Sequence, residues 1–178
     1  AELNVYNNAS IAADDMTRGY NSGKDFEATF VDKYGNPLAN TDVQFTVDGK
    51  VYTVRTDANG HAVLNVKLAA GKHTVVVRNP SDGSTITKSV TIVKSIQSNS
   101  NKNIFYLDGS TYKVRVYGAD GKVVGAGQVV TFKVNGKTYK VKTDKNGWAT
   151  LKLNIKTLVP KNKKYTVTAA YNGFTVKN

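Results

Sequence analysis

The chain has 178 residues, of which 40% are hydrophobic and 21% are charged, a mixture typical of a folded globular protein rather than a disordered one. Cysteine is absent, which excludes disulfides, thiolate metal sites and cysteine nucleophiles. No apolar run approaches the length that a membrane-spanning helix needs. Any domain in this chain must therefore be held together by its own hydrophobic core.

The net charge of +12 is unevenly distributed along the chain. Residues 1–94 carry ten basic and ten acidic side chains, whereas residues 95–178 carry fourteen lysines and one arginine against three aspartates. All of the excess positive charge thus lies in the second half. Such an excess favours an anionic partner for that half.

The first half is predicted to consist of short β-strands, because apolar and polar residues alternate with a period of two. Strands are expected at Phe26–Val31, Val43–Val47 and Val51–Arg55, with Asp48-Gly49 forming a type I′ hairpin turn between the last two. The Thr56–Gly60 turn then leads to a strand through Leu64. Further strands are expected near Lys72–Arg78 and Thr85–Ile92. No segment shows the apolar period of 3.6 residues that indicates a helix.

The second half repeats the first. Residues Phe45–Leu64 match Phe132–Leu151 at a constant offset of 87, and Asn135-Gly136 takes the place of the first hairpin turn. A one-residue insertion precedes the matched segment in the second copy, and a five-residue insertion around Pro160 follows it. The sequence predicts two tandem immunoglobulin-like β-sandwich domains of about seven strands each, over 1–94 and 95–178. Residues 95–103 are expected to be a linker plus the first edge strand of the second domain.

The residues that carry this repeat also resemble a known family. They are Gly-Asn-Pro-Leu-Ala-Asn before the Val43 strand, Thr-Asp-x-Asn-Gly-x-Ala-x-Leu in both copies, and a later strand with Lys-His/Tyr-Thr-Val. This pattern resembles bacterial Ig-like repeats, and especially those of adhesin-like surface proteins in methanogenic archaea of the Methanobrevibacter type. Invasin/intimin-type repeats and carboxypeptidase-regulatory-like modules share it more loosely. The resemblance implies an extracellular, wall-associated location and a role in display or attachment, without an active site or cofactor.

Thr56–Gly60 and Thr143–Gly147 admit two interpretations, a fragment of a calcium loop or a tight turn in which Asp bonds the backbone and Gly adopts positive φ. The turn is favoured, because a calcium loop needs further oxygen ligands and a distal acid. His61 and His73 lack a third metal ligand, so ordinary structural roles are expected. Neither a nucleophile elbow nor a phosphate-binding glycine loop is present, and the chain is interpreted as non-enzymatic. Asn8-Ala9-Ser10 is an N-glycosylation sequon.

Strand alternation predicts that six cations of the second copy point outward and form a cationic sheet surface, namely Lys113, Arg115, Lys133, Lys140, Lys142 and Lys152. This surface could bind an anionic polymer such as a wall polysaccharide or a glycan of a host or partner cell. It could equally keep the domain soluble and its strand edges from pairing. Nucleic acid is disfavoured, since arginines and exposed stacking aromatics are scarce. Three functions remain open: a spacer in a surface stalk alongside adjacent repeats, a binding module, or an accessory domain of a wall-active enzyme.

Overall fold

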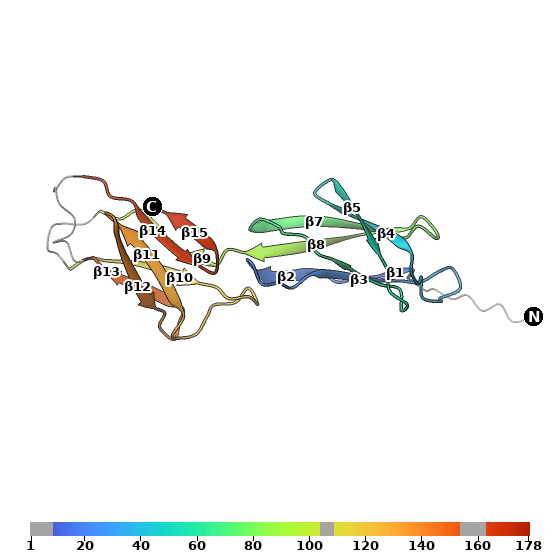
Figure 1. The fold of residues 1–178 in the computed structure, drawn as a ribbon, viewed down its shortest axis with the longest axis horizontal. Helices are drawn as coiled ribbons and strands as arrows, with labels where there is room; N and C mark the ends of the chain where they lie inside the picture. Colours follow the sequence, from blue (N-terminus) through green and yellow to red (C-terminus); the bar gives the residue numbers. More distant parts are fainter. Residues whose placement is uncertain (1–8, 104–108, 154–162) are drawn as a thin grey trace, which may run out of the picture. The chain divides into compact units, whose positions relative to one another are not determined.

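The computed structural model describes residues 9–103, 109–153 and 163–178 (Figure 1). They fall into two compact units. The first unit comprises the residues up to Thr17 and Gly23–Ile92. The second unit comprises Arg18–Ser22 and Val93–Asn178. The described residues form β-strands, and among them no helix is long and apolar enough to span a membrane.

Strands β1–β8 form two sheets. One sheet has the strand order β1-β3-β6 and the other has the order β2-β8-β7-β4-β5. Strand β4 pairs antiparallel with both β5 and β7, and β3 pairs antiparallel with β1 and β6. The strand bounds are β1 Ile11–Ala12, β2 Met16–Gly19, β3 Phe26–Phe30, β4 Asp42–Val47, β5 Lys50–Arg55, β6 His61–Leu64, β7 Gly71–Arg78 and β8 Thr85–Val93.

Strands β9–β15 repeat this arrangement. The strand order is β13-β10-β9 in one sheet and β12-β11-β14-β15 in the other, and all of these neighbours are antiparallel. The strand bounds are β9 Ile96–Gln97, β10 Thr111–Val116, β11 Val129–Val134, β12 Lys137–Lys142, β13 Trp148–Lys152, β14 Val167–Tyr171 and β15 Phe174–Lys177.

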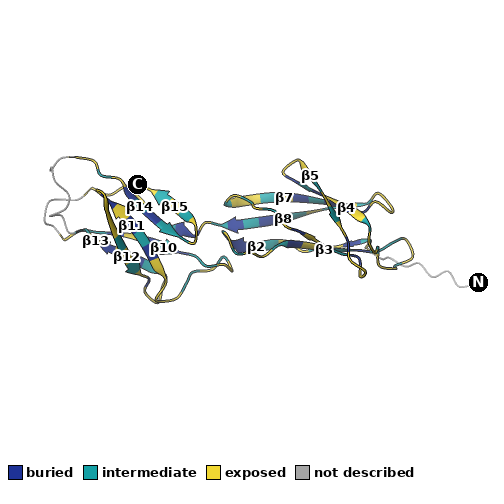
Figure 2. Ribbon diagram, viewed as in Figure 1, coloured by how far each residue is buried: buried dark blue, intermediate teal, exposed yellow. Residues whose placement is uncertain are grey.

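The inward-facing residues of the two sheets meet in a buried core, and buried and exposed residues alternate along the strands (Figure 2). Phe45 of β4 lies edge-on to Phe26 and Phe30 of β3, with ring centroids 6.1 and 6.2 Å apart. In the second unit Phe132 of β11 lies edge-on to Tyr112 of β10 at 6.1 Å. Since each contact joins strands of different sheets, each set of strands is a β-sandwich. The predicted all-β, immunoglobulin-like fold is confirmed.

Apart from β2, the strands of the two copies correspond in order, and the β3–β6 and β4–β5 pairs have the same register as β10–β13 and β11–β12. Strands β4 and β5 match β11 and β12 at the offset of 87, and the turns at Asp48-Gly49 and Asn135-Gly136 have positive φ at both residues, as a type I′ turn requires. The pair Ala28–Ala62 corresponds to Val114–Ala149, which places the one-residue insertion between β10 and β11. Both hairpins and the upstream insertion are thus confirmed.

The first edge strands differ from the prediction. Among the described residues the first set has eight strands rather than seven, because Ile11–Ala12 and Met16–Gly19 pair at sheet edges. Strand β9 confirms an edge strand within 95–103, and its Ile96 is only 1% exposed. The domain limits 1–94 and 95–178 stay a prediction.

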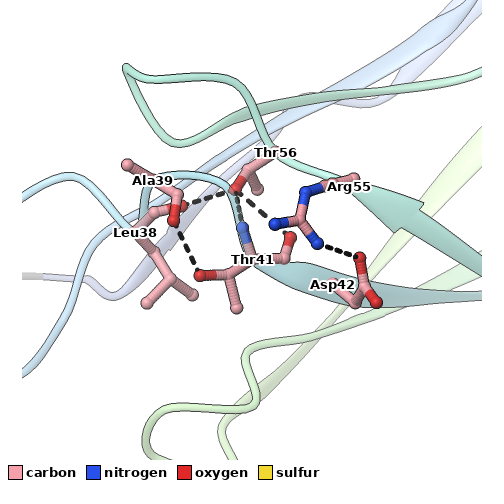
Figure 3. Close-up of polar contacts among 6 residues, drawn as sticks. All are labelled: Leu38, Ala39, Thr41, Asp42, Arg55 and Thr56. Carbon is pink, nitrogen blue, oxygen red and sulfur yellow. Dashed lines mark hydrogen bonds and ion pairs between the residues drawn. The ribbon is translucent and has the colours of Figure 1, made fainter.

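A buried threonine fixes the entry into the first strand of each hairpin. The Thr56 hydroxyl donates to the Leu38 carbonyl at 2.6 Å and accepts the Thr41 amide at 2.9 Å (Figure 3). In the second unit Thr143 repeats both bonds, to the Gly125 carbonyl at 2.7 Å and from the Gln128 amide at 3.0 Å. Thr56 and Thr143 are 2% and 4% exposed, so each hydroxyl satisfies backbone groups that water reaches poorly.

The following aspartate and glycine close the turn. One Asp57 carboxylate oxygen accepts the amides of Asn59 and His61 at 2.8 and 3.0 Å, and Asp144 accepts those of Asn146 and Trp148 at the same distances. Gly60 and Gly147 have φ of +73° and +75°. These bonds confirm the turn interpretation of Thr-Asp-x-Asn-Gly.

Replacing Gly147 with alanine is expected to destabilise the second unit far more than replacing Gly136. Both glycines have φ near +75°, which costs an alanine about 1–2 kcal/mol. A Cβ at Gly147 would also lie 2.5 Å from Val123 Cγ1 and 3.0 Å from the Val124 carbonyl oxygen, whereas one at Gly136 meets nothing within 4 Å. We expect Gly147→Ala to cost on the order of 3 kcal/mol or more. Urea unfolding followed by the fluorescence of the single tryptophan measures both, and equal losses would contradict the steric account.

Replacing Thr143 with valine is expected to lower the free energy of unfolding by about 1–3 kcal/mol, because the Gly125 carbonyl and the Gln128 amide lose their shared partner. The matched control is Thr150→Val on β13, where the side chain is exposed and valine suits a strand. The same fluorescence-detected urea curves compare the two variants. A Thr143→Val variant as stable as Thr150→Val would show that the hydroxyl does not hold the turn.

Candidate anion-binding surfaces

The six cations predicted to face outward lie on two sheets rather than on one. Lys113, Arg115 and Lys152 are on β10 and β13, while Lys133, Lys140 and Lys142 are on β11 and β12. Arg115 is half-buried and the other five are exposed. The outward orientation is confirmed, but the expectation of a single cationic surface is wrong, because β10–β13 and β11–β12 belong to opposite layers of the sandwich.

We call the outer face of the β12-β11-β14-β15 sheet the lysine–threonine face. Across the strands its cations are separated by threonines, since Lys133 lies opposite Thr138 and Thr168, and Lys140 lies opposite Thr131. Along β12, Lys140 and Lys142 lie two residues apart on the same side. Lys177 of β15, which the sequence analysis did not single out, lies opposite Thr168. No lysine of this face stands directly opposite another in the described register, and this spacing limits repulsion between like charges.

We call the outer face of the β13-β10-β9 sheet the tryptophan face. Lys113 and Arg115 lie two residues apart on β10, so both point to the same side, and Arg115 is paired with Trp148 of β13. The Lys113 Nζ atom lies 4.8 Å from the centroid of the Trp148 ring and the Arg115 Cζ atom lies 5.6 Å from it. Arg115 Nε also donates to the Asn146 carbonyl at 3.3 Å. This face therefore gathers two cations around one aromatic ring.

Sequence reasoning missed Trp148 as a site residue. Its position on a strand after the Asp144 turn predicts that it faces outward, but Lys113 lies 35 residues earlier in the chain. Only the pairing of β10 with β13 brings the two side chains together.

In the first unit, one arginine and two histidines lie beside carboxylates. Arg55 lies 3.4 Å from Asp42 (Figure 3), His61 lies 3.4 Å from Glu27, and His73 lies 2.6 Å from Asp48. The corresponding carboxylate positions of the second unit hold Val129, Lys113 and Asn135. Over the residues that the structure describes, none of the six cations forms an ion pair. The second unit thus keeps the sandwich but not the carboxylates that offset charge in the first.

The remaining predictions have mixed outcomes. Both histidines take the structural roles expected of them: His73 is bonded to Asp48 and to the Ala69 carbonyl at 2.8 Å, and His61 contacts Glu27 at the sheet surface. No group of three or more His, Asp or Glu side chains within the described ranges could hold a metal ion. Asn8 of the predicted glycosylation sequon lies outside the described residues.

No protein-family model matches the sequence, and no curated protein sequence matches it. Among solved structures, the chain is similar to a calcium-stabilised adhesin that helps an Antarctic bacterium bind ice, with 18% identity over 96% of this chain and a TM-score of 0.36; the chain spans about half (47%) of that adhesin. It is also similar to fibronectin(III)-like modules of Clostridium thermocellum CbhA (16% identity, 94% and 90% of the two chains, TM-score 0.30). A tandem pair of titin immunoglobulin domains gives 15% identity, 94% and 92% coverage and a TM-score of 0.32. Likenesses of this strength assign no activity to this chain.

Acid is expected to destabilise the first unit through its hydrogen-bonded carboxylates. The His73 ring and the Thr74 amide hold the pKa of Asp48 below its ordinary value of 3.8, and the amides of His61 and Asn59 do the same to the pKa of Asp57. Because the folded-state pKa values are depressed, their stabilisation is fully present above pH 3.8 and is lost as the pH falls through the folded-state values. Amide exchange of β4–β7, corrected for the intrinsic pH dependence of exchange, should therefore accelerate as the pH falls below 3.8.

The control for this pH dependence is Asp48→Asn, which keeps an acceptor oxygen but removes the titrating proton. This variant should be less protected than the wild type at pH 7 and should lose less on acidification. An equal loss in the variant and the wild type would show that Asp48 does not contribute to the acid response.

Proposed function

We propose that the chain is a non-enzymatic pair of tandem immunoglobulin-like repeats, over 1–94 and 95–178, of an extracellular adhesin-like surface protein. The repeats act as a stalk or spacer, and the second unit docks on an anionic polysaccharide of a cell wall or on the glycan of a host or partner cell. The observation that carries this proposal is the contrast in charge between the halves: residues 1–94 carry as many acidic as basic side chains, whereas residues 95–178 carry the whole charge of +12 and present six cations without an ion pair within the described residues.

The first half of the chain supports this assignment, because it forms the same sandwich without excess positive charge. Residues 1–94 have no net charge, so the fold and its solubility as a spacer do not depend on excess lysine. Carrying the whole charge of +12 on residues 95–178 adds repulsion between like charges, which an anionic partner would relieve. The cations of the lysine–threonine face have no aromatic ring among them in the described register and are compatible with solubility. The cations that crowd around Trp148 are what a binding surface provides.

The test measures retention of the full chain on immobilised polygalacturonate, a carboxylated polysaccharide, across a salt series. We expect retention at low ionic strength and release as salt rises toward about 0.5 M, because the Debye length shrinks from about 10 Å at 0.1 M. Immobilised dextran, a neutral polysaccharide, should not retain the chain.

Two variants with equal loss of charge locate the binding. Replacing the six outward cations of the second half (Lys113, Arg115, Lys133, Lys140, Lys142 and Lys152) with glutamine should abolish retention. Replacing six lysines of the first half with glutamine (Lys24, Lys33, Lys50, Lys67, Lys72 and Lys88) should leave it unchanged. If both variants bind equally, or if the wild type is not retained at low salt, the docking role is wrong and only the spacer role survives.

A further inference from the structure

We propose that the tryptophan face, and not the lysine–threonine face, is the polymer-binding surface, and that it binds a sugar ring bearing a carboxylate. In this site the flexible Lys113 side chain turns from the Trp148 ring to the carboxylate, which it holds together with Arg115, and the ring surface that it leaves stacks against the sugar. The inference rests on the proposed function, that the second unit docks on an anionic polysaccharide.

The first argument is the arrangement of charge. Lys113 and Arg115 share one side of β10 and both lie within 6 Å of the Trp148 ring centroid, a distance at which the negative face of an indole attracts a cation. The ring therefore holds two like charges side by side. A bound carboxylate would contact both cations at once. The lysine–threonine face also has two neighbouring cations, Lys140 and Lys142 of β12, but its outward positions in the described register hold no aromatic ring.

The second argument is the hydrogen-bonding capacity of Arg115. Its Nε donates to the Asn146 carbonyl, which ties the guanidinium to the turn that also carries Trp148. Its two terminal nitrogens have no hydrogen-bond partner among the described residues. A guanidinium held at Nε presents these donors as a fork, and a carboxylate matches a fork with two parallel bonds. The site is thus suited to a carboxylate more than to a single point charge.

The third argument concerns Trp148 itself. It is half-buried at an outward strand position, so it contributes a flat apolar surface to the solvent side of the sheet rather than to the core. One face of a pyranose ring carries mainly C–H groups and is comparably apolar. Stacking the two removes apolar surface from water, and the indole N–H remains available as a donor to a sugar hydroxyl. The Trp148 ring therefore suits the pyranose ring of a uronic acid, and the neighbouring cations suit its carboxylate.

The first unit provides an internal comparison at the same place in the fold. The positions of Lys113, Arg115 and Trp148 are held there by Glu27, Thr29 and His61. Glu27 and His61 contact each other at 3.4 Å, so the sandwich accommodates an acid and a small ring at these positions. The basic and aromatic set of the second unit is thus not a requirement of the fold.

The experiment titrates tetragalacturonate into the full chain and follows the fluorescence of Trp148, the only tryptophan in the sequence. We expect a saturable change in its emission, weakened by added salt. The variant Lys113→Glu with Trp148→His recreates the pair found in the first unit. Calorimetry should show that it binds at least about tenfold more weakly, since a charged hydrogen bond and the stacking surface are both removed.

The matched control is Lys133→Gln with Lys140→Gln, which lowers the positive charge by the same two units on the other face and should bind within about threefold of the wild type. A second test variant, Lys113→Gln with Arg115→Gln, keeps the ring and should also lose binding. Urea unfolding curves followed by far-ultraviolet circular dichroism, which does not depend on Trp148, establish that each variant folds.

The outcomes separate this inference from the proposed function. If the control loses binding and the Lys113→Glu, Trp148→His variant keeps it, the tryptophan face is the wrong surface although docking stands. If tripolyphosphate, an anion without a sugar ring, binds as tightly as tetragalacturonate and leaves the emission of Trp148 unchanged, recognition of the sugar is wrong. If neither the oligomer nor immobilised polygalacturonate binds, the docking function itself fails.

Discussion

The structure depends on one buried phenylalanine in each sandwich, Phe45 and Phe132, which packs against aromatic rings of the opposite sheet. Without cysteine, no disulfide joins the two sheets, so such apolar contacts are a main source of their cohesion, and burying a phenylalanine is worth roughly 1.5–3 kcal/mol. Because side chains alternate along a strand, fixing these rings inward fixes their neighbours outward. The packing that builds the core therefore also decides that Lys133 and Lys113 face solvent.

The two copies separate what the fold needs from what it tolerates. The buried threonine, the turn aspartate and the glycine of each copy make the same bonds at nearly the same distances, since the backbone groups they satisfy are part of the sandwich. The outer face of the three-stranded sheet is under no such constraint. There Glu27 and His61 in one unit correspond to Lys113 and Trp148 in the other, an exchange that reverses the charge of the surface without altering strand pairing.

Periodicity and the internal repeat were enough to predict the strands, both hairpins and the fold. They did not reveal the edge strands Ile11–Ala12 and Met16–Gly19, because two to four residues are too few to show alternation. They also predicted which lysines face outward but not which of them lie together. That depends on strand order, and the partners Lys113 and Trp148 are distant in sequence. In the folded chain the predicted cationic surface is two surfaces on opposite sheets, and Trp148 belongs to one of them.

The charge of the second half could be explained by solubility alone, but solubility is best served by charges that are spread apart and by few exposed aromatics. The lysine–threonine face exposes no aromatic ring at its outward positions in the described register. The tryptophan face departs from that description, since an indole on the solvent side lies within 6 Å of both Lys113 and Arg115. In the free chain the two neighbouring cations repel each other and the indole is partly hydrated apolar surface, and both are unfavourable. A carboxylated sugar offsets both costs in a single contact, and for that reason we assign the binding to this face.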